Sequence, residues 1–252
     1  FLPGFGTIKS AFTQQVDLLV SLDASNINRV RGLDYYLSEF SPQTIVNIDH
    51  HGDNSSFGHL NLIQDKSSVG EILVDLFELL NVSMSSDMAT CLYAAIAFDT
   101  GRFLYSNTTA NTFKVVSKLI DHNANSSLVH QKLYENHPKE SFDMLKVAFD
   151  RLVVNYSLRY AYTVIPKSAK LAPIKVIDYI RMLGNIDVLV VFREYSTKEV
   201  RVNFRSKSEF NVQKIAAYFG GGGHDKAAGL QLKGVIHDVV NKVIQRLENS
   251  LK

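Results

Sequence analysis

Five side chains that commonly bind metal ions follow apolar runs of this sequence: Asp23, Asp49, His50, His51 and Asp99. An isolated aspartate after a strand is more often a turn residue or a helix cap, so the prediction depends on the set as a whole. Carboxylates that converge repel one another unless a cation neutralises them. A mixture of aspartate and histidine ligands suits Mn²⁺, Zn²⁺ or Fe²⁺ better than Ca²⁺. The residue types therefore predict a site for a divalent metal ion.

A second group of residues is suited to holding a phosphate. Four consecutive glycines at positions 220–223 precede His224. Such a run costs conformational entropy, and it is useful where backbone N–H groups approach an anion closely. Upstream, Arg201, Asn203 and Arg205 share one face of a predicted strand, since side chains alternate along it. Ser206 and Lys207 follow at the strand's end. The alternative is a flexible linker beside a solvated basic strand.

The elements that must position these residues alternate in the first half of the chain. Apolar runs at 16–22, 44–48 and 59–63 predict strands that end near the first two aspartates. Helical spacing of apolar residues predicts helices at 28–40, 69–80, 88–98, 109–120, 127–135 and 140–152. Strands that alternate with helices are typical of a mostly parallel α/β sheet, where ligands bind at the carboxyl ends of the strands.

The pattern changes after residue 150. Two hairpins are predicted, at 152–158 with 160–165 and at 188–192 with 199–204, followed by a helix at 211–218, a strand at 230–232 and a helix at 235–251. The sequence thus predicts two α/β domains, with a mostly parallel sheet in the first and a smaller mixed sheet in the second. We place the first at 1–138, a linker helix at 139–150 and the second at 151–252.

Composition narrows the class of protein. With 27 basic and 25 acidic residues among 252, the formal charge of +2 does not predict a polycationic coat, so a bound polyanion needs a local basic cluster. The single cysteine, Cys91, excludes a disulfide scaffold and favours a reducing compartment, which we take to be the cytoplasm. No apolar run is long enough to predict a transmembrane helix.

Several motifs in this order resemble those of the DHH/DHHA1 phosphoesterases. Asp49-His50-His51 resembles the DHH signature, and Gly221-Gly222-Gly223-His224 resembles the signature of the DHHA1 domain. The segments DTGRF at 99–103 and FRSK at 204–207 are similar to motifs of the nanoRNase branch. Members of that branch are oligoribonucleases that also dephosphorylate 3′-phosphoadenosine 5′-phosphate (PAP).

The resemblance implies a function and a role for each matching residue. It implies hydrolysis of short RNA, short single-stranded DNA or nucleotide phosphates by hydroxide attack at two Mn²⁺ ions, with the cleaved phosphate near the metals, and it leaves a homodimer open. The implied metal ligands are Asp23, His50 and Asp99. The implied catalytic residues are His51 and Arg102 at the phosphate, with Asp49 orienting the histidines. The implied substrate-binding residues are Arg205, Ser206, Gly221, Gly222, Gly223 and His224.

The chain departs from the family in one respect. Nothing before Asp23 matches the first motif, which supplies one histidine and two aspartates to the metals. We expect a DHH domain that is incomplete at its N-terminus; the alternative is a short variant that binds one ion. Three other functions remain open: a RecJ-like single-strand exonuclease, a phosphodiesterase for cyclic or linear dinucleotides, and a nucleotide-binding module with weakened catalysis.

Overall fold

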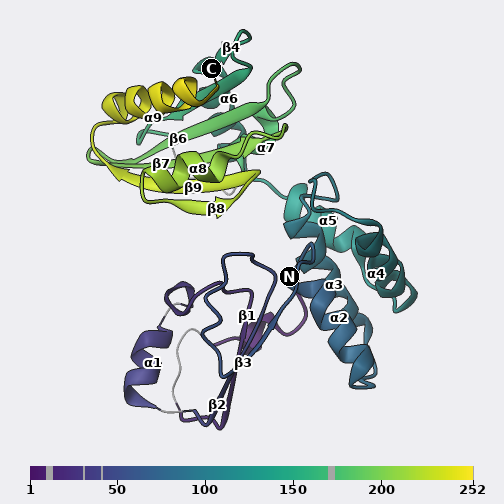
Figure 1. Cartoon of the computed structure of the whole chain (residues 1–252). Coiled ribbons are helices and arrows are strands. Elements are labelled where there is room, and N and C mark those ends of the chain that lie inside the picture. The colour runs from purple at the N-terminus through teal and green to yellow at the C-terminus, as the bar shows by residue number, and fades with distance from the viewer. Residues whose placement is uncertain (10–13, 31, 41, 170–173, 252) are drawn as a thin grey trace. The chain divides into compact units, whose positions relative to one another are not determined.

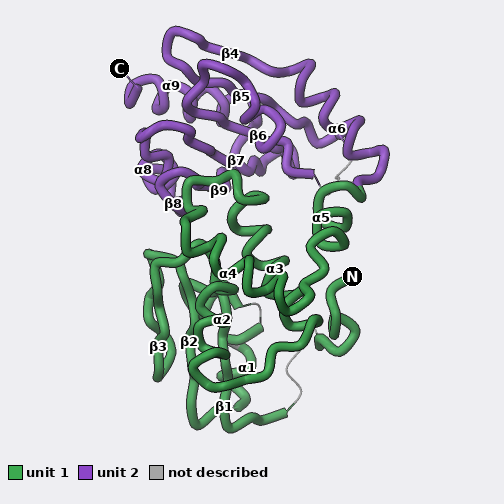
Figure 2. Tube along the Cα trace, turned by 90° about the vertical axis from the view of Figure 1, so that its right-hand side faces the viewer, with its two compact units in different colours: residues 1–136 green, residues 137–252 purple. Residues whose placement is uncertain are grey.

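The computed structural model describes residues 1–9, 14–30, 32–40, 42–169 and 174–251 (Figure 1). Within it the chain divides into two compact units, residues 1–136 and 137–252, which Figure 2 shows in separate colours. Unit 1 contains a parallel sheet and unit 2 a mixed sheet, each with its own helices. The predicted α/β fold class is therefore confirmed.

The sheet of unit 1 has three parallel strands in the order β1-β2-β3. They are β1 (Leu18–Leu22), β2 (Thr44–Asp49) and β3 (Leu60–Ile63). Leu19 and Ile45 pack on one side against helix α1 (Leu33–Glu39), and Ile48 packs against helix α2 (Val69–Leu79). Because the strands are parallel, their carboxyl ends lie at the same edge of the sheet.

Helix α3 (Ser86–Asp99) forms the centre of the helical part of unit 1. It is apolar on most of its surface and packs against α2, α4 (Ala110–Asp121) and α5 (Ser126–Tyr134). A helix that is apolar on most sides is stable only when other helices surround it. Ser85 caps its first turn by accepting a hydrogen bond from Met88 N, and the helix ends at Asp99, so that burial of α3 fixes the position of this carboxylate.

The sheet of unit 2 has six strands in the order β4-β5-β6-β7-β9-β8, of which only β5 and β6 pair in parallel. The strands are β4 (Val153–Asn155), β5 (Tyr160–Ile165), β6 (Val188–Ser196), β7 (Glu199–Ser206), β8 (Gly222–His224) and β9 (Ala227–Lys233). The hairpins β4–β5 and β6–β7 confirm the two that the alternation of apolar residues predicts.

Two cores cover opposite faces of this sheet. On one face Val202 and Phe204 of β7 pack against α8 (Val212–Tyr218) and α9 (Ile236–Leu251). On the other, Leu189 of β6 packs against α6 (Lys139–Asp150) and α7 (Val176–Ile180). Each fully buried side chain of this kind contributes about 1.5–3 kcal/mol. Helix α6, expected as a linker, has Met144 and Ala148 in this core and belongs to the fold of unit 2.

A few elements differ from the prediction. The helix expected at 28–40 is divided into a 3₁₀ turn, η2 (Ile27–Arg29), and α1, which begins after Gly32 with a φ of 78°. A second 3₁₀ turn, η1 (Phe5–Thr7), lies near the N-terminus. The short helix α7 and strand β8 were not predicted, because five and three residues are too few to show a period. None of the described helices is long and apolar enough to cross a membrane.

Candidate active site

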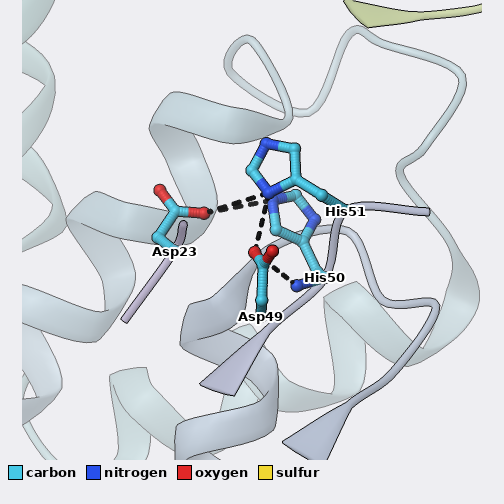
Figure 3. Close-up of side chains that lie close together, drawn as sticks. All are labelled: Asp23, Asp49, His50 and His51. Carbon is cyan, nitrogen blue, oxygen red and sulfur yellow. Dashed lines mark hydrogen bonds and ion pairs between the residues drawn. The ribbon is translucent and has the colours of Figure 1, made fainter. Parts of the chain in front are cut away.

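Four side chains converge at the carboxyl edge of the parallel sheet in unit 1. The potential ligand atoms of Asp23, Asp49, His50 and His51 all lie within 4.8 Å of one another (Figure 3). Asp23 follows β1 directly, and its backbone nitrogen donates to the carbonyl oxygen of Ile48 at 3.0 Å. Its φ of 60° turns the chain out of the sheet. The neighbouring strand ends thus bring together residues that are far apart in sequence.

Asp49 is completely buried, and both of its carboxylate oxygens accept hydrogen bonds. Oδ1 accepts from the backbone nitrogen of His50 at 2.8 Å and from Nδ1 of His51 at 2.7 Å. Oδ2 accepts from the side-chain amide of Asn54. Burial raises the pKa of this carboxyl, but the hydrogen bonds from His51 and Asn54 outweigh it and leave the pKa below its usual value. Asp49 is therefore a charged group that orients its neighbours.

The ring of His50 is held in one orientation and one tautomer. Its Nδ1 lies 3.1 Å from the carbonyl oxygen of Lys66, which can only accept, so Nδ1 carries the proton. The lone pair of Nε2 then points to the cluster, 3.4 Å from Oδ1 of Asp23 and 3.9 Å from Oδ2 of Asp99. A backbone carbonyl behind a histidine is a common way of fixing a metal-binding imidazole.

The acidic groups around His50 shift one another's pKa values. When the His50 ring is protonated on both nitrogens, its Nε2 donates a hydrogen bond to Asp23, and this bond lowers the pKa of Asp23. Burial lowers the pKa of His50, but its contacts with Asp23 and the Lys66 carbonyl raise it more, so the net shift is upward. Burial, together with the charge of Asp23, raises the pKa of Asp99. The carboxylates of Asp23 and Asp99 thus destabilise each other without a cation.

The donor set of Asp23, His50 and Asp99 fits a divalent ion of the first transition row. Two ligand atoms that are each about 2.1 Å from one ion lie roughly 3–3.5 Å apart. The observed separations of 3.4 and 3.9 Å from His50 Nε2 are close to this range. Asp49 is less suited as a ligand, because His50, His51 and Asn54 already occupy its oxygens.

A buried polar network lies behind Asp99. Ser68 donates a hydrogen bond to its carboxylate, and the side-chain amide of Asn107 donates to its carbonyl oxygen at 3.2 Å. The same amide lies 3.1 Å from the carbonyl oxygen of Ser67. Glu71, itself fully buried, accepts from the hydroxyls of Ser67 and Thr112. This network joins α2, α4 and the end of α3, so it fixes the position of Asp99.

Arg102 lies in an unusual turn after Asp99. Gly101, Arg102 and Phe103 have φ values of 55°, 64° and 65°, three successive residues in the left-handed region. The guanidinium of Arg102 lies 5.0 Å from the centroid of the Tyr134 ring. Among the described residues, no hydrogen bond or ion pair joins Arg102 to the Asp–His cluster. Arg102 thus follows Asp99 by three residues in the sequence, and its guanidinium packs on the ring of Tyr134.

In unit 2, Arg205 and His224 lie on one face of the sheet. Both are in register with Ala227 of β9, which lies between them. Directly paired residues of antiparallel strands point to the same face. Asn203, Gly229 and Gly222 form the next line of residues on this face. Two of the three residues in that line are glycines, so no side chains rise from the sheet at these positions beside the line of Arg205 and His224.

Gly221, Gly222 and Gly223 differ in how closely the neighbouring strand approaches them. A Cβ on Gly221 would lie 2.4 Å from the carbonyl oxygen of Gly229, and one on Gly223 would lie 2.5 Å from that of Ala227. These two are required by the close approach of the backbone to β9. A Cβ on Gly222 would meet no atom within 4 Å, so packing does not explain this glycine. The nearby Ser206 hydroxyl is buried and donates to the carbonyl oxygen of Ser208.

Sequence reasoning did not find Asn54, the Lys66 carbonyl or Asn107. Asn54 follows the histidines in a loop rich in polar residues, where nothing in the sequence distinguishes it from a turn residue. A backbone carbonyl has no sequence signature at all. Glu71 lies within the predicted helix at 69–80, where no sequence signal separates it from an exposed glutamate, and its burial comes from the packing of α2 against α4.

One family model matches most of unit 2. Residues 159–252 match the DHHA1 domain family. The parallel sheet of unit 1, with Asp49-His50-His51 at its carboxyl edge, stands before the matched residues in the chain. Together with relatives over most of the chain, this match bears out the predicted resemblance to the DHH/DHHA1 phosphoesterases.

Relatives are found over most of the chain. The bifunctional oligoribonuclease and PAP phosphatase NrnA of Thermus thermophilus is 28% identical over 237 residues, which cover 92% of this chain and 71% of the relative. The protein of the same name from Bacillus subtilis is 28% identical and covers 95% of this chain and 77% of its own. The names of these relatives are those of hydrolytic enzymes, which agrees with the predicted phosphoesterase class.

One solved structure has the same fold over most of the chain. An exopolyphosphatase-related protein from Bacteroides fragilis matches with a TM-score of 0.80 and 21% identity. The match covers 93% of this chain and 71% of that protein. At 21% identity this similarity establishes the fold alone. The substrate and the mechanism have to be inferred from the residues of the site.

Proposed function

We propose that this protein is a Mn²⁺-dependent phosphoesterase that hydrolyses short oligonucleotides and removes the 3′-phosphate of PAP. The observation that carries the proposal is the position of His50 Nε2, fixed by the Lys66 carbonyl and facing the carboxylates of Asp23 and Asp99. Three such groups at the carboxyl edge of a parallel sheet suit a catalytic divalent ion. The names of the relatives supply the substrate classes.

In this proposal each residue of unit 1 has a separate task. A bound divalent ion supplies Lewis acidity and lowers the pKa of water. Asp23, His50 and Asp99 would hold the ion. His51 receives its orientation from Asp49 and presents Nε2 to a phosphate oxygen. Arg102 stabilises the charge that develops on the phosphate in the transition state.

Unit 2 supplies substrate binding in this proposal. Arg205 and His224 lie beside the line that contains Gly222 and Gly229, where they hold a terminal phosphate by charge and hydrogen bonding. Gly222 leaves space for the ligand, whereas Gly221 and Gly223 keep the backbone close to β9. Ser206 fixes the end of β7 through its buried hydroxyl. Recognition of a chain end instead of bases favours short single strands of RNA or DNA without a sequence preference.

The assay compares substrates with Mn²⁺ present: an RNA dinucleotide, a long single-stranded RNA, a long single-stranded DNA, and PAP. We expect the dinucleotide and PAP to be hydrolysed fastest. Asp99→Asn should lower turnover by more than about a hundredfold, because it removes a charged ligand without changing shape. Asp121→Asn, at an exposed position on α4, is the matched control and should leave turnover unchanged.

Three results would contradict this proposal. Turnover that is equal in Asp99→Asn and the control would rule out Asp99 as a ligand. Preferential cleavage of the long strands would favour a RecJ-like exonuclease. Binding of dinucleotide without any product would favour a nucleotide-binding module.

A further inference from the structure

Unit 2 contains a basic pocket between α7 and the strands β6 and β7. Its volume is about 300 Å³. The side chains that give it its chemistry are Lys175, Arg193, Tyr195, Arg201, Asn203 and Arg205. Only Arg205 of these belongs to the terminal-phosphate site described above. The rest of the pocket therefore needs its own explanation.

Two arginines lie directly opposite each other in this pocket. Arg193 of β6 and Arg201 of β7 are paired in the antiparallel register. Like charges in directly opposite positions destabilise a sheet. None of the ion pairs among the described residues involves either arginine, and the hydrogen bond of Arg193 goes to the sulfur of Met144, a weak acceptor. An anion bound between the two guanidinium groups would remove this repulsion.

The paired arginines are separated from Arg205 along β7. Every second residue of this part of β7 points to the same face, and the three that line the pocket are Arg201, Asn203 and Arg205. Four residues of strand span about 13 Å at roughly 3.3 Å each. One phosphate group cannot contact both ends of such a surface. A ligand that contacts both ends therefore needs at least two separated anionic groups, as successive phosphates of an oligonucleotide provide.

The pocket also has an apolar wall suited to the nucleoside. Ile174, Ile177 and Val191 line it together with the half-exposed ring of Tyr195. The guanidinium of Arg193 lies 5.8 Å from the centroid of that ring. Aromatic rings beside arginines commonly stack bases of single-stranded nucleic acids regardless of sequence. The wall and the cations together match a nucleotide better than an inorganic anion.

We propose that Arg193 and Arg201 form a second phosphate subsite, which holds an internal phosphodiester of an oligonucleotide whose terminal phosphate contacts Arg205. The inference rests on the proposed function for its substrate class. It adds that affinity rises from a mononucleotide to a trinucleotide, because only the longer ligand reaches both ends of β7. Tyr195 lies against the intervening nucleoside.

The test measures binding without hydrolysis. The full-length protein in EDTA is titrated with a fluorescent trinucleotide that carries a 5′-phosphate, and adenosine 5′-monophosphate is measured by competition. Arg201→Gln and Arg193→Gln are compared with Lys146→Gln, an exposed control on α6. We expect each arginine variant to bind the trinucleotide about tenfold more weakly, as the loss of a charge-assisted contact predicts. Affinity for the mononucleotide should not change.

The dependence on salt gives a second readout. Each arginine variant should make the slope of log affinity against log salt less negative by about 0.7, the value for one phosphate contact on a single strand. If Arg201→Gln and Arg193→Gln match the control in both readouts, the subsite does not exist. Equal losses for the trinucleotide and the mononucleotide would also overturn it. Hydrolysis by the wild-type protein with Mn²⁺ is scored separately, so a failure of the proposed function does not mimic a failure of the subsite.

Discussion

Asp49 Oδ1 lies 2.7 Å from Nδ1 of His51, inside a part of unit 1 that excludes water from the carboxylate. The same oxygen accepts from the backbone nitrogen of His50. One buried carboxylate therefore orients the ring of His51 and holds the backbone of His50, whose ring the Lys66 carbonyl orients. The aspartate of the triplet thus contacts both histidines.

Asp49→Asn should weaken metal binding while the fold is retained. The amide keeps the size of the side chain but replaces one acceptor by a donor, so the backbone nitrogen of His50, the proposed metal ligand, loses its charged partner. Loss of such an orienting group typically costs 10–100-fold in metal affinity. Calorimetric titration of the variant with Mn²⁺ should show this loss of affinity. Excess Mn²⁺ should restore part of the activity.

Asp53→Asn is the matched control for this experiment, because Asp53 is an exposed aspartate in the same loop. Its Mn²⁺ affinity should equal that of the wild type. An unchanged affinity in Asp49→Asn would show that His50 keeps its position as a ligand without the carboxylate.

Arg205→Ala should raise KM more than it lowers kcat. One nitrogen of the guanidinium donates to the carbonyl oxygen of Phe204 at 2.9 Å, while the buried Nε has no hydrogen-bond partner in the described structure. We expect KM for the dinucleotide to rise by about tenfold or more, as the loss of one charge-assisted contact predicts. Arg205→Lys keeps the charge without the fork of donors and should be intermediate. A fall in kcat at constant KM would instead place Arg205 at the reacting phosphate.

Gly223→Ala and Gly222→Ala should separate folding from binding. Gly223 has a φ of 132°, and its added Cβ would lie 2.5 Å from a backbone oxygen, so we expect a loss of about 2 kcal/mol or more in the free energy of unfolding. Gly222 has open space, and its variant should unfold with the wild-type midpoint. Gly222→Ala should nevertheless weaken dinucleotide binding. Equal denaturant midpoints for both variants would contradict the close packing of β8 on β9.

The contact between Tyr160 and Glu248 should make the protein sensitive to alkali. The tyrosine hydroxyl donates to the carboxylate at 2.5 Å. Burial, and after it this hydrogen bond, raises the pKa of Tyr160 to about 12. A raised pKa contributes stability that is complete below the unfolded value near 10 and is lost as the pH rises towards 12.

We therefore expect this contribution to fall by on the order of 1 kcal/mol by pH 11. Urea unfolding between pH 8 and pH 11 measures it, with Tyr160→Phe compared with Tyr156→Phe, whose ring is exposed. The Tyr160→Phe variant should be less stable at pH 8, and its stability should decline less with pH. Parallel pH profiles for the two variants would disprove the link.

The sequence predicts most of the fold because its signals are local. The β-branched run that becomes β2 and the helical spacing in α2 each contain enough residues to show their period. Helix α7 and strand β8 are too short for that. The place of α6 in unit 2 depends on Met144 and Ala148 meeting strands that come later in the chain, which no local pattern encodes.

The candidate site was predictable to the extent that its residues end regular elements. Asp23 and Asp49 stand at the ends of neighbouring parallel strands, which the sheet brings together, and Asp99 ends helix α3, whose burial fixes its position. The partners that fix their orientation could not be predicted. The Lys66 carbonyl is part of the backbone, and Asn54 reaches Asp49 only because the loop folds back.

The turn that carries Arg102 lowers the stability of the fold. Non-glycine residues in left-handed conformation cost on the order of 1 kcal/mol each, and Arg102 and Phe103 occupy it in succession. Glycine at either position would relieve that strain, so a selection for heat tolerance alone would favour replacing Arg102. In the proposed function, the protein selected in this way would be more stable but would lack the guanidinium that stabilises charge on the phosphate.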